Sequence, residues 1–170
     1  IDNAETKQLT SSLSEHAKPA WGQGIRTLAW NSNSDGVYAL RSEDTVVRIW
    51  KYSIDGAGSE VCWDSNYTDI TTIAVCPNDD TLACLASGSN IPASIVTVAL
   101  DNSIDVKVIA RAQELTISSN SLSLPKPVQW TGDDAAIVHG LYYPPINESS
   151  GLPPGIIMVH GGPTGQSTSS

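Results

Sequence analysis

The sequence has few basic residues and no long apolar run, and each shortage excludes a class of protein. Lys and Arg number nine against eighteen Asp and Glu, which gives a net charge of -9 at pH 7. Because the nine cations are spread along the chain without a cluster, we expect no nucleic-acid partner. No apolar segment is long enough to span a bilayer, so we expect no membrane segment. The acidic excess is best explained by solubility.

Cysteine is also scarce, and the acidic residues form no recognisable motif. The three cysteines, Cys62, Cys76 and Cys84, include no Cys-x-x-Cys pair and have no histidine nearby, which argues against a zinc site. An odd count argues against a full disulfide framework. Cys76 and Cys84 lie in strand-like stretches, where cysteine behaves as a small core residue. The carboxylates match no metal-site or glycosidase pattern, so we expect no metal and no cofactor.

The sequence shows no initiating methionine, no signal peptide and no targeting tail. We therefore expect that Ile1 is not the native start of the protein. Two Asn-x-Ser/Thr sequons, at Asn66 and Asn147, matter only if the protein is secreted. A cytoplasmic and a secreted location therefore both stay as alternatives. Assembly into an oligomer stays possible as well.

What the sequence does contain is a repeat of short strands. With 170 residues, 40% of them hydrophobic and 16% charged, the chain has a globular composition. Helix signals are scarce, and Gly, Asn, Asp and Ser separate short alternating segments. The segment "IRTLAWNSNSDGVYAL" (25–40) matches "ITTIAVCPNDDTLACL" (70–85), with Asp35-Gly36 and Asp80-Thr81 at the same tight-turn position. A second hairpin follows each segment, so each unit has four strands.

Units of this length and strand number are typical of β-propeller blades. The outer strands end alike, on 54–56 and on 100–102, and residues 1–3 repeat that ending a third time. The chain is thus expected to open on the last strand of one blade and to hold two complete blades. Two blades cannot close a ring, which predicts a piece of a larger protein. A small β-sandwich is the alternative fold.

The pattern changes after Ala112. "QELTISSNSLSLPKPVQW" is typical of a linker, and "AAIVHGLYYPP" predicts a strand that ends at Pro144-Pro145. The apolar run "IIMV" (156–159) predicts a strand buried on both faces of a mostly parallel sheet. We therefore divide the chain into 1–115, the C-terminal part of a propeller, and 116–170, a linker and the truncated start of a second domain.

The junction segments "LPKPVQWTGDDAAIVHGLYYPP" and "PPGIIMVHGGPTGQ" resemble the prolyl oligopeptidase family of serine peptidases. The closer likeness is to the acylaminoacyl-peptidase and dipeptidyl-peptidase branch, in which a propeller caps an α/β-hydrolase domain. The resemblance implies a mainly β chain, with partial propeller blades followed by the first strands of the α/β-hydrolase domain. The sequence departs from the family at Asp133-Asp134, where Asp-Gly is usual. In the dipeptidyl branch, paired glutamates of the propeller loops can bind the N-terminus of the substrate. The blades here contain no Glu-Glu pair, so an aminopeptidase of that particular kind is unsupported.

The segment "HGGP" carries the candidate site. Acyl transfer passes through a tetrahedral oxyanion, and glycines after a sheet strand can present backbone N–H groups to it. The resemblance assigns this oxyanion-hole role to Gly161 and Gly162, with Gly162 preferred, and makes His160 a loop residue that shapes the site. His160 is not the triad histidine, and Pro163 is expected to stiffen the turn. His16, in a polar linker, and His139, in a strand, are expected to be structural or exposed.

No Gly-x-Ser-x-Gly nucleophile motif occurs in the chain, and the tail "STSS" is interpreted as a flexible end or a cut site rather than as a nucleophile. The resemblance therefore implies a fragment of a serine peptidase that acts on peptide or acyl-aminoacyl bonds of short peptides. Its Ser-His-Asp triad would lie outside this chain, which alone is expected to be inactive. The expected partners are short peptide substrates and the remainder of its own hydrolase domain. A non-catalytic propeller module for protein binding and a carboxylesterase-type α/β-hydrolase remain as alternatives.

Overall fold

The computed structural model describes residues 6–19, 21–100, 104–146, 150–162 and 166–170. The third copy of the strand ending, at 1–3, and the sequon at Asn147 therefore lie outside the described residues. Within them the regular secondary structure is β-strand, apart from one short 3₁₀ turn, η1 (Ser119–Ser121). This agrees with the scarcity of helix signals in the sequence.

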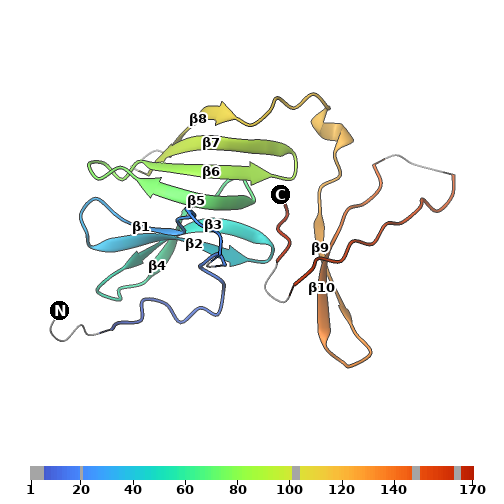
Figure 1. Cartoon of the computed structure of the whole chain (residues 1–170), viewed down its shortest axis with the longest axis horizontal. Coiled ribbons are helices and arrows are strands. Elements are labelled where there is room, and N and C mark those ends of the chain that lie inside the picture. Colours follow the sequence, from blue (N-terminus) through green and yellow to red (C-terminus); the bar gives the residue numbers. More distant parts are fainter. Residues whose placement is uncertain (1–5, 20, 101–103, 147–149, 163–165) are drawn as a thin grey trace.

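Two antiparallel sheets of four strands each make up most of the fold (Figure 1). Each sheet is a simple meander, with its strands in sequence order. The first sheet contains β1 (Leu28–Trp30), β2 (Gly36–Glu43), β3 (Val46–Ser53) and β4 (Ser59–Trp63). The second contains β5 (Asp69–Val75), β6 (Leu82–Gly88), β7 (Ile91–Ala99) and β8 (Asp105–Arg111).

The register of the two sheets confirms the repeat that the sequence predicts. Trp30 pairs with Val37 in the first sheet, and Val75 pairs with Leu82 in the second, so both partners are displaced by the same 45 positions. The turns match as well. Asn31 N–H donates to the Gly36 carbonyl at 3.0 Å, and Cys76 N–H donates to the Thr81 carbonyl at 2.8 Å. The chain thus contains two four-stranded units of the same design. Successive blades of a β-propeller resemble one another in the same way.

The two sheets lie face to face, and the core fills the space between them. β5 contacts β1, β2 and β3, so the first strand of the second sheet lies against the first sheet. The buried side chains come from both sheets, which excludes two separate cores. They are Tyr38, Leu40, Val47, Ile49, Trp63, Ile70, Ile73, Leu82, Cys84, Ala86, Val96 and Val98.

Polar contacts fix the two sheets relative to one another at their turns. The Asp80 carboxylate, in the β5–β6 turn, accepts a hydrogen bond from the Ser32 N–H and one at 3.2 Å from the Tyr38 hydroxyl. A backbone contact also joins β5 to the segment just before β1, because Ile73 N–H donates to the Arg26 carbonyl at 2.9 Å. Burial and the contact with Asp80 raise the pKa of Tyr38 above its ordinary value, so its hydroxyl remains a hydrogen-bond donor.

Beyond the second sheet, a separate hairpin is formed by β9 (Lys126–Thr131) and β10 (Ile137–Tyr142). The strand predicted before Pro144-Pro145 is thus confirmed, and the end of the predicted linker is itself a strand. The turn closes despite the departure at Asp133-Asp134, because Gly132 N–H donates to the Ala136 carbonyl at 2.8 Å and the Asp134 carboxylate accepts from Ala136 N–H.

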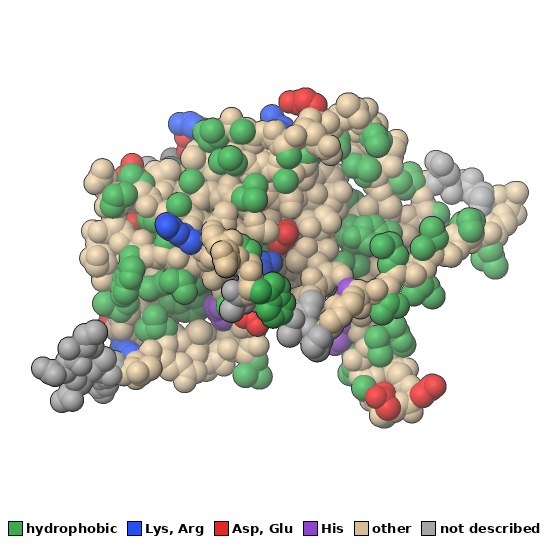
Figure 2. Space-filling model, viewed as in Figure 1, with side chains coloured by type: hydrophobic (Ala, Val, Ile, Leu, Met, Phe, Trp, Pro, Cys, Tyr) green, Lys and Arg blue, Asp and Glu red, His purple; other side chains and the backbone are tan. Residues whose placement is uncertain are grey.

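The buried strand predicted at 156–159 is wrong in this structure. Ile156, Ile157, Met158 and Val159 belong to no strand, and each side chain is 88–92% exposed. A parallel strand needs hydrogen-bonding neighbours and covered faces, and among the described residues no strand pairs with this run. Figure 2 shows that the hydrophobic side chains of the segment around 156–159 and of the β9–β10 hairpin project away from the two sheets. The architecture is therefore two blade-like sheets and a hairpin, with no closed ring among the described residues.

The central position of Ile73 yields a first prediction. Its side chain is 2% exposed and lies between the sheets, so Ile73→Ala is expected to cost about 2–5 kcal/mol of unfolding free energy. Urea denaturation followed by tryptophan fluorescence measures this loss. The matched control is Ile109→Ala on β8, where the side chain is 62% exposed and a change within about 0.5 kcal/mol is expected. Equal losses for the two variants would contradict the placement of the core.

A second prediction concerns alkaline pH. Burial raises the pKa of Cys84 to about 12, from an ordinary value of 9.0, so the folded state keeps the proton that the unfolded state loses. The contribution of the protonated Cys84 thiol to the free energy of unfolding is fully present below pH 9. It is lost progressively as the pH rises toward 12. Between those values the wild type should lose about 1.4 kcal/mol more per pH unit than Cys84→Ala. Urea midpoints measured under reducing conditions test this. Ile109→Ala, which removes an exposed side chain with no titratable group, is the control and should follow the wild type.

Candidate functional site: the His160–Gly162 loop

The loop predicted from "HGGP" follows directly on the exposed apolar run. His160, Gly161 and Gly162 are all exposed, and Pro163 lies outside the described residues. Gly162 has a φ of +73°, in the left-handed region that favours glycine. A Cβ added at Gly161 or Gly162 would meet nothing within 4 Å. The backbone conformation at 162 thus favours glycine, and the loop leaves open space beside both glycines.

The three predicted site residues come together only as neighbours in sequence. The His160 ring contacts its own loop, with Nδ1 at 3.3 Å from the Gly161 carbonyl oxygen. An oxyanion hole needs two donors that point at one atom, and a nucleophile beside them. Among the described residues no hydrogen bond joins a serine or cysteine side chain to a histidine ring. The loop therefore offers candidate donors, and the rest of a catalytic arrangement is not formed by this part of the chain.

The other histidines have the structural and exposed positions that the sequence predicts. His16 Nδ1 lies 2.8 Å from the Ser14 carbonyl oxygen, which can only accept, so Nδ1 carries a proton. Nε2 lies 2.7 Å from the Tyr52 hydroxyl, and in the neutral ring it accepts from that hydroxyl. Both ring nitrogens are thus engaged: Nδ1 contacts its own N-terminal segment, and Nε2 joins that segment to Tyr52 on β3. His139 lies exposed on β10.

Two of the three cysteines, Cys62 and Cys84, are poor candidates for a nucleophile. All three are free, which agrees with the expected absence of a disulfide framework. Burial raises the pKa of both Cys62 and Cys84 to about 12, so the reactive thiolate is suppressed at neutral pH. Cys84 is a core residue, as predicted, whereas Cys76 lies half-buried just after β5.

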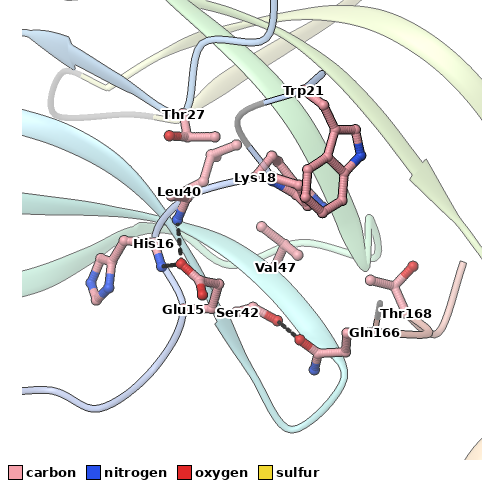
Figure 3. Close-up of a pocket in the computed structure, with 12 residues that line it drawn as sticks. Glu15, His16, Lys18, Trp21, Thr27, Leu40, Ser42, Val47, Gln166 and Thr168 are labelled. Atoms are coloured by element: carbon pink, nitrogen blue, oxygen red, sulfur yellow. Dashed lines mark hydrogen bonds between the residues drawn. The ribbon is translucent and has the colours of Figure 1, made fainter. Parts of the chain in front are cut away.

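A pocket of about 440 Å³ lies between the N-terminal segment and the first sheet, and no sequence pattern predicts it (Figure 3). Glu15, His16 and Lys18 line it from the N-terminal segment, and Gln166 and Thr168 line the opposite side. The Glu15 carboxylate accepts from the backbone N–H groups of residues 16 and 17, at 3.0 and 2.8 Å. Its charge is therefore engaged with the backbone. The pocket walls come from segments about 150 residues apart, a proximity that no local pattern reveals.

The described residues offer neither a metal-binding cluster nor a membrane-spanning helix. No group of three or more His, Cys, Asp and Glu side chains is placed to hold a metal ion there. No helix in that part of the chain is long and apolar enough to cross a membrane.

Comparison with known proteins relates the chain to peptidases. No family model matches it. The chain is 22% identical over 135 residues to the uncharacterized peptidase YuxL of Bacillus subtilis, a match that covers 79% of the chain and 20% of YuxL. Among solved structures, a puromycin-hydrolyzing peptidase of Mycobacterium tuberculosis superposes with a TM-score of 0.74 at 19% identity. That superposition covers 85% of this chain and 22% of the peptidase.

A second solved structure is the AtxE2 isopeptidase with astexin3-dC4 bound. It superposes with a TM-score of 0.54 at 15% identity, over 79% of this chain and 20% of the isopeptidase. At these identities the structural matches establish a shared fold. The chain spans about a fifth of the length of the peptidases that it matches. The similar proteins are thus peptidases, and the mainly β fold of this chain corresponds to one part of them.

Proposed function

We propose that this chain is part of a serine peptidase of the prolyl oligopeptidase type, acting on peptide or acyl-aminoacyl bonds of short peptides. The observation that carries the proposal is the order of elements along the chain. Two blade-like sheets are followed by the β9–β10 hairpin and then by a loop whose Gly162 has a left-handed backbone. The similarity to three proteins named as peptidases supports it.

In the proposed mechanism, a serine outside this chain attacks the carbonyl carbon of the substrate. A histidine takes the serine proton, and an aspartate orients that histidine. The tetrahedral oxyanion accepts a hydrogen bond from the Gly162 N–H, with Gly161 as the alternative donor from the same loop. His160 shapes the loop. The blades restrict entry to short peptides, and the exposed run 156–159 becomes a strand when the remainder of the hydrolase domain supplies its neighbours.

The two alternatives explain less of the chain. A non-catalytic propeller module accounts for the blades, but it does not require an apolar run that ends in His160 and two glycines. A carboxylesterase-type hydrolase accounts for the glycine loop. It does not account for two repeated blade-like sheets ahead of that loop. The peptidase proposal accounts for both features.

Labelling with a fluorophosphonate probe tests the proposal. The longer polypeptide that carries this chain and the 170-residue chain alone are each treated, and their intact masses are read. We expect an adduct on the longer polypeptide and none on the 18.0 kDa chain. An adduct on the chain itself would show that a nucleophile lies within it, and no adduct on either would argue for the binding module. Turnover of p-nitrophenyl esters without turnover of acyl-aminoacyl anilides would favour the esterase.

The glycine loop itself is tested by Gly162→Ala in the longer polypeptide. Alanine is strained at a φ of +73°, so the loop shifts and the N–H no longer points at the oxyanion. We expect kcat to fall at least about tenfold, toward the 10²–10³-fold loss of a missing donor. Gly155→Ala is the control, since it also has open space around its Cβ position and no left-handed φ. Equal kcat values for the two variants would remove Gly162 from the proposed role.

A further inference from the structure

The C-terminal residues of the chain lie in a polar notch at the edge of the two sheets. The sequence suggested a flexible end for "STSS", and that interpretation is wrong for Ser169, whose side chain is only 7% exposed. Figure 1 shows this end of the chain beside the turns at one edge of both sheets. A serine is buried here by contacts with residues about 80 to 124 positions away in sequence.

Three segments supply the walls of the notch, and each contributes one polar group. The Thr45 carbonyl, in the β2–β3 turn, accepts from the Ser169 N–H at 3.0 Å and from its hydroxyl at 3.1 Å. The Thr68 hydroxyl, between β4 and β5, donates to the Ser169 carbonyl at 2.7 Å. The Ser89 hydroxyl, in the β6–β7 turn, donates to the same carbonyl. All three polar groups of one serine residue are therefore bound.

The two sheets, rather than the tail, hold the walls in place. Thr68 N–H donates to the Ser87 carbonyl of the second sheet at 2.9 Å. The Thr68 carbonyl accepts from the Val47 N–H of the first sheet, also at 2.9 Å. The Thr68 hydroxyl is thus positioned at the junction of the sheets by backbone contacts with both of them. The notch is preorganised, which lowers the entropic cost of binding a ligand there.

The notch is selective for a small hydroxyl residue. It presents one carbonyl acceptor and two hydroxyl donors, which carry no net charge, and the buried Ser169 side chain leaves little space for a larger group. Beside it, the Ser42 hydroxyl donates to the Gln166 side-chain oxygen at 3.4 Å. A buried ligand residue that lacked the hydroxyl would lose one hydrogen bond, worth about 0.5–1.5 kcal/mol.

We propose that this notch is a binding site for a peptide segment with serine at its centre, and that residues 168–170 of the chain occupy it here. The site reads the N–H, the carbonyl and the hydroxyl of one residue, and therefore recognises peptide backbone as well as a side chain. The same chemistry is available from the chain's own segment and from a separate peptide. The proposal does not depend on the peptidase chemistry, so each can fail without the other.

Amide hydrogen exchange of the 170-residue chain, followed by NMR, tests occupancy by its own segment. The Ser169 N–H should exchange at least about tenfold more slowly than that of Ser167, which is exposed. The double variant Thr68→Val/Ser89→Ala removes both donors and should abolish this difference, whereas Ser167→Ala should leave it unchanged. The Ile73 amide, which is bonded to Arg26, reports that the fold of each variant is intact. Equal exchange of Ser169 and Ser167 in the wild type would overturn the proposal.

A second arm identifies the source of the ligand. Ser169→Pro removes the donated N–H and the hydroxyl, so the chain's own segment cannot fill the notch. This variant is titrated with acetyl-Gln-Ser-Thr-Ser-Ser-amide, and with the same peptide carrying alanine at the fourth position. Saturable shifts of the Thr45, Thr68 and Ser89 amides with the serine peptide, at least about threefold weaker with the alanine peptide, would show recognition of separate peptides. Protection of Ser169 in the first arm without shifts in the second would assign the notch to the chain's own segment.

Discussion

The rest of the structure depends on the burial of one sheet face against another. A four-stranded antiparallel sheet satisfies its backbone hydrogen bonds internally, but its apolar face must be covered. Here Ile49, Ile70, Ile73, Val96 and Val98 are removed from water between the two sheets. The Asp80 contacts with Ser32 and Tyr38 then fix the position of one sheet on the other, because the turns of both sheets meet there.

The pocket and the notch described above both depend on segments that lie far apart in the sequence. The pocket beside Glu15 exists because the N-terminal segment crosses the first sheet and is held by the His16–Tyr52 contact. The notch around Ser169 exists because three turns of two sheets end at the same edge. Neither hollow belongs to one strand or one turn. The notch follows from how the two repeated units stack, whereas the pocket depends on the two end segments of the chain lying on the first sheet.

The glycine loop shows the opposite situation, in which local sequence sets the conformation without a surrounding site. Gly162 adopts its left-handed φ in open space, next to an apolar run that has no neighbouring strand among the described residues. Such a run is stable in water only when other strands cover it, since 88–92% exposure of four large side chains is unfavourable. In the proposed enzyme, the loop therefore becomes a donor of hydrogen bonds only after its strand is built into a larger sheet.

The sequence by itself determined the repeat, the strand pairing and the hairpin, because these depend on alternation and on turn residues that lie within a few positions of one another. The identical register around Trp30 and Val75, and the strand that ends before Pro144, are of this kind. It also determined the left-handed glycine of the loop. Only the tertiary structure decided that the side chains of 156–159 are exposed and that Ser169 is buried. The apolar pattern of the first predicts burial but not whether partner strands are present, and the polar tail carries no local signal for a notch whose walls lie about 80 to 124 residues away.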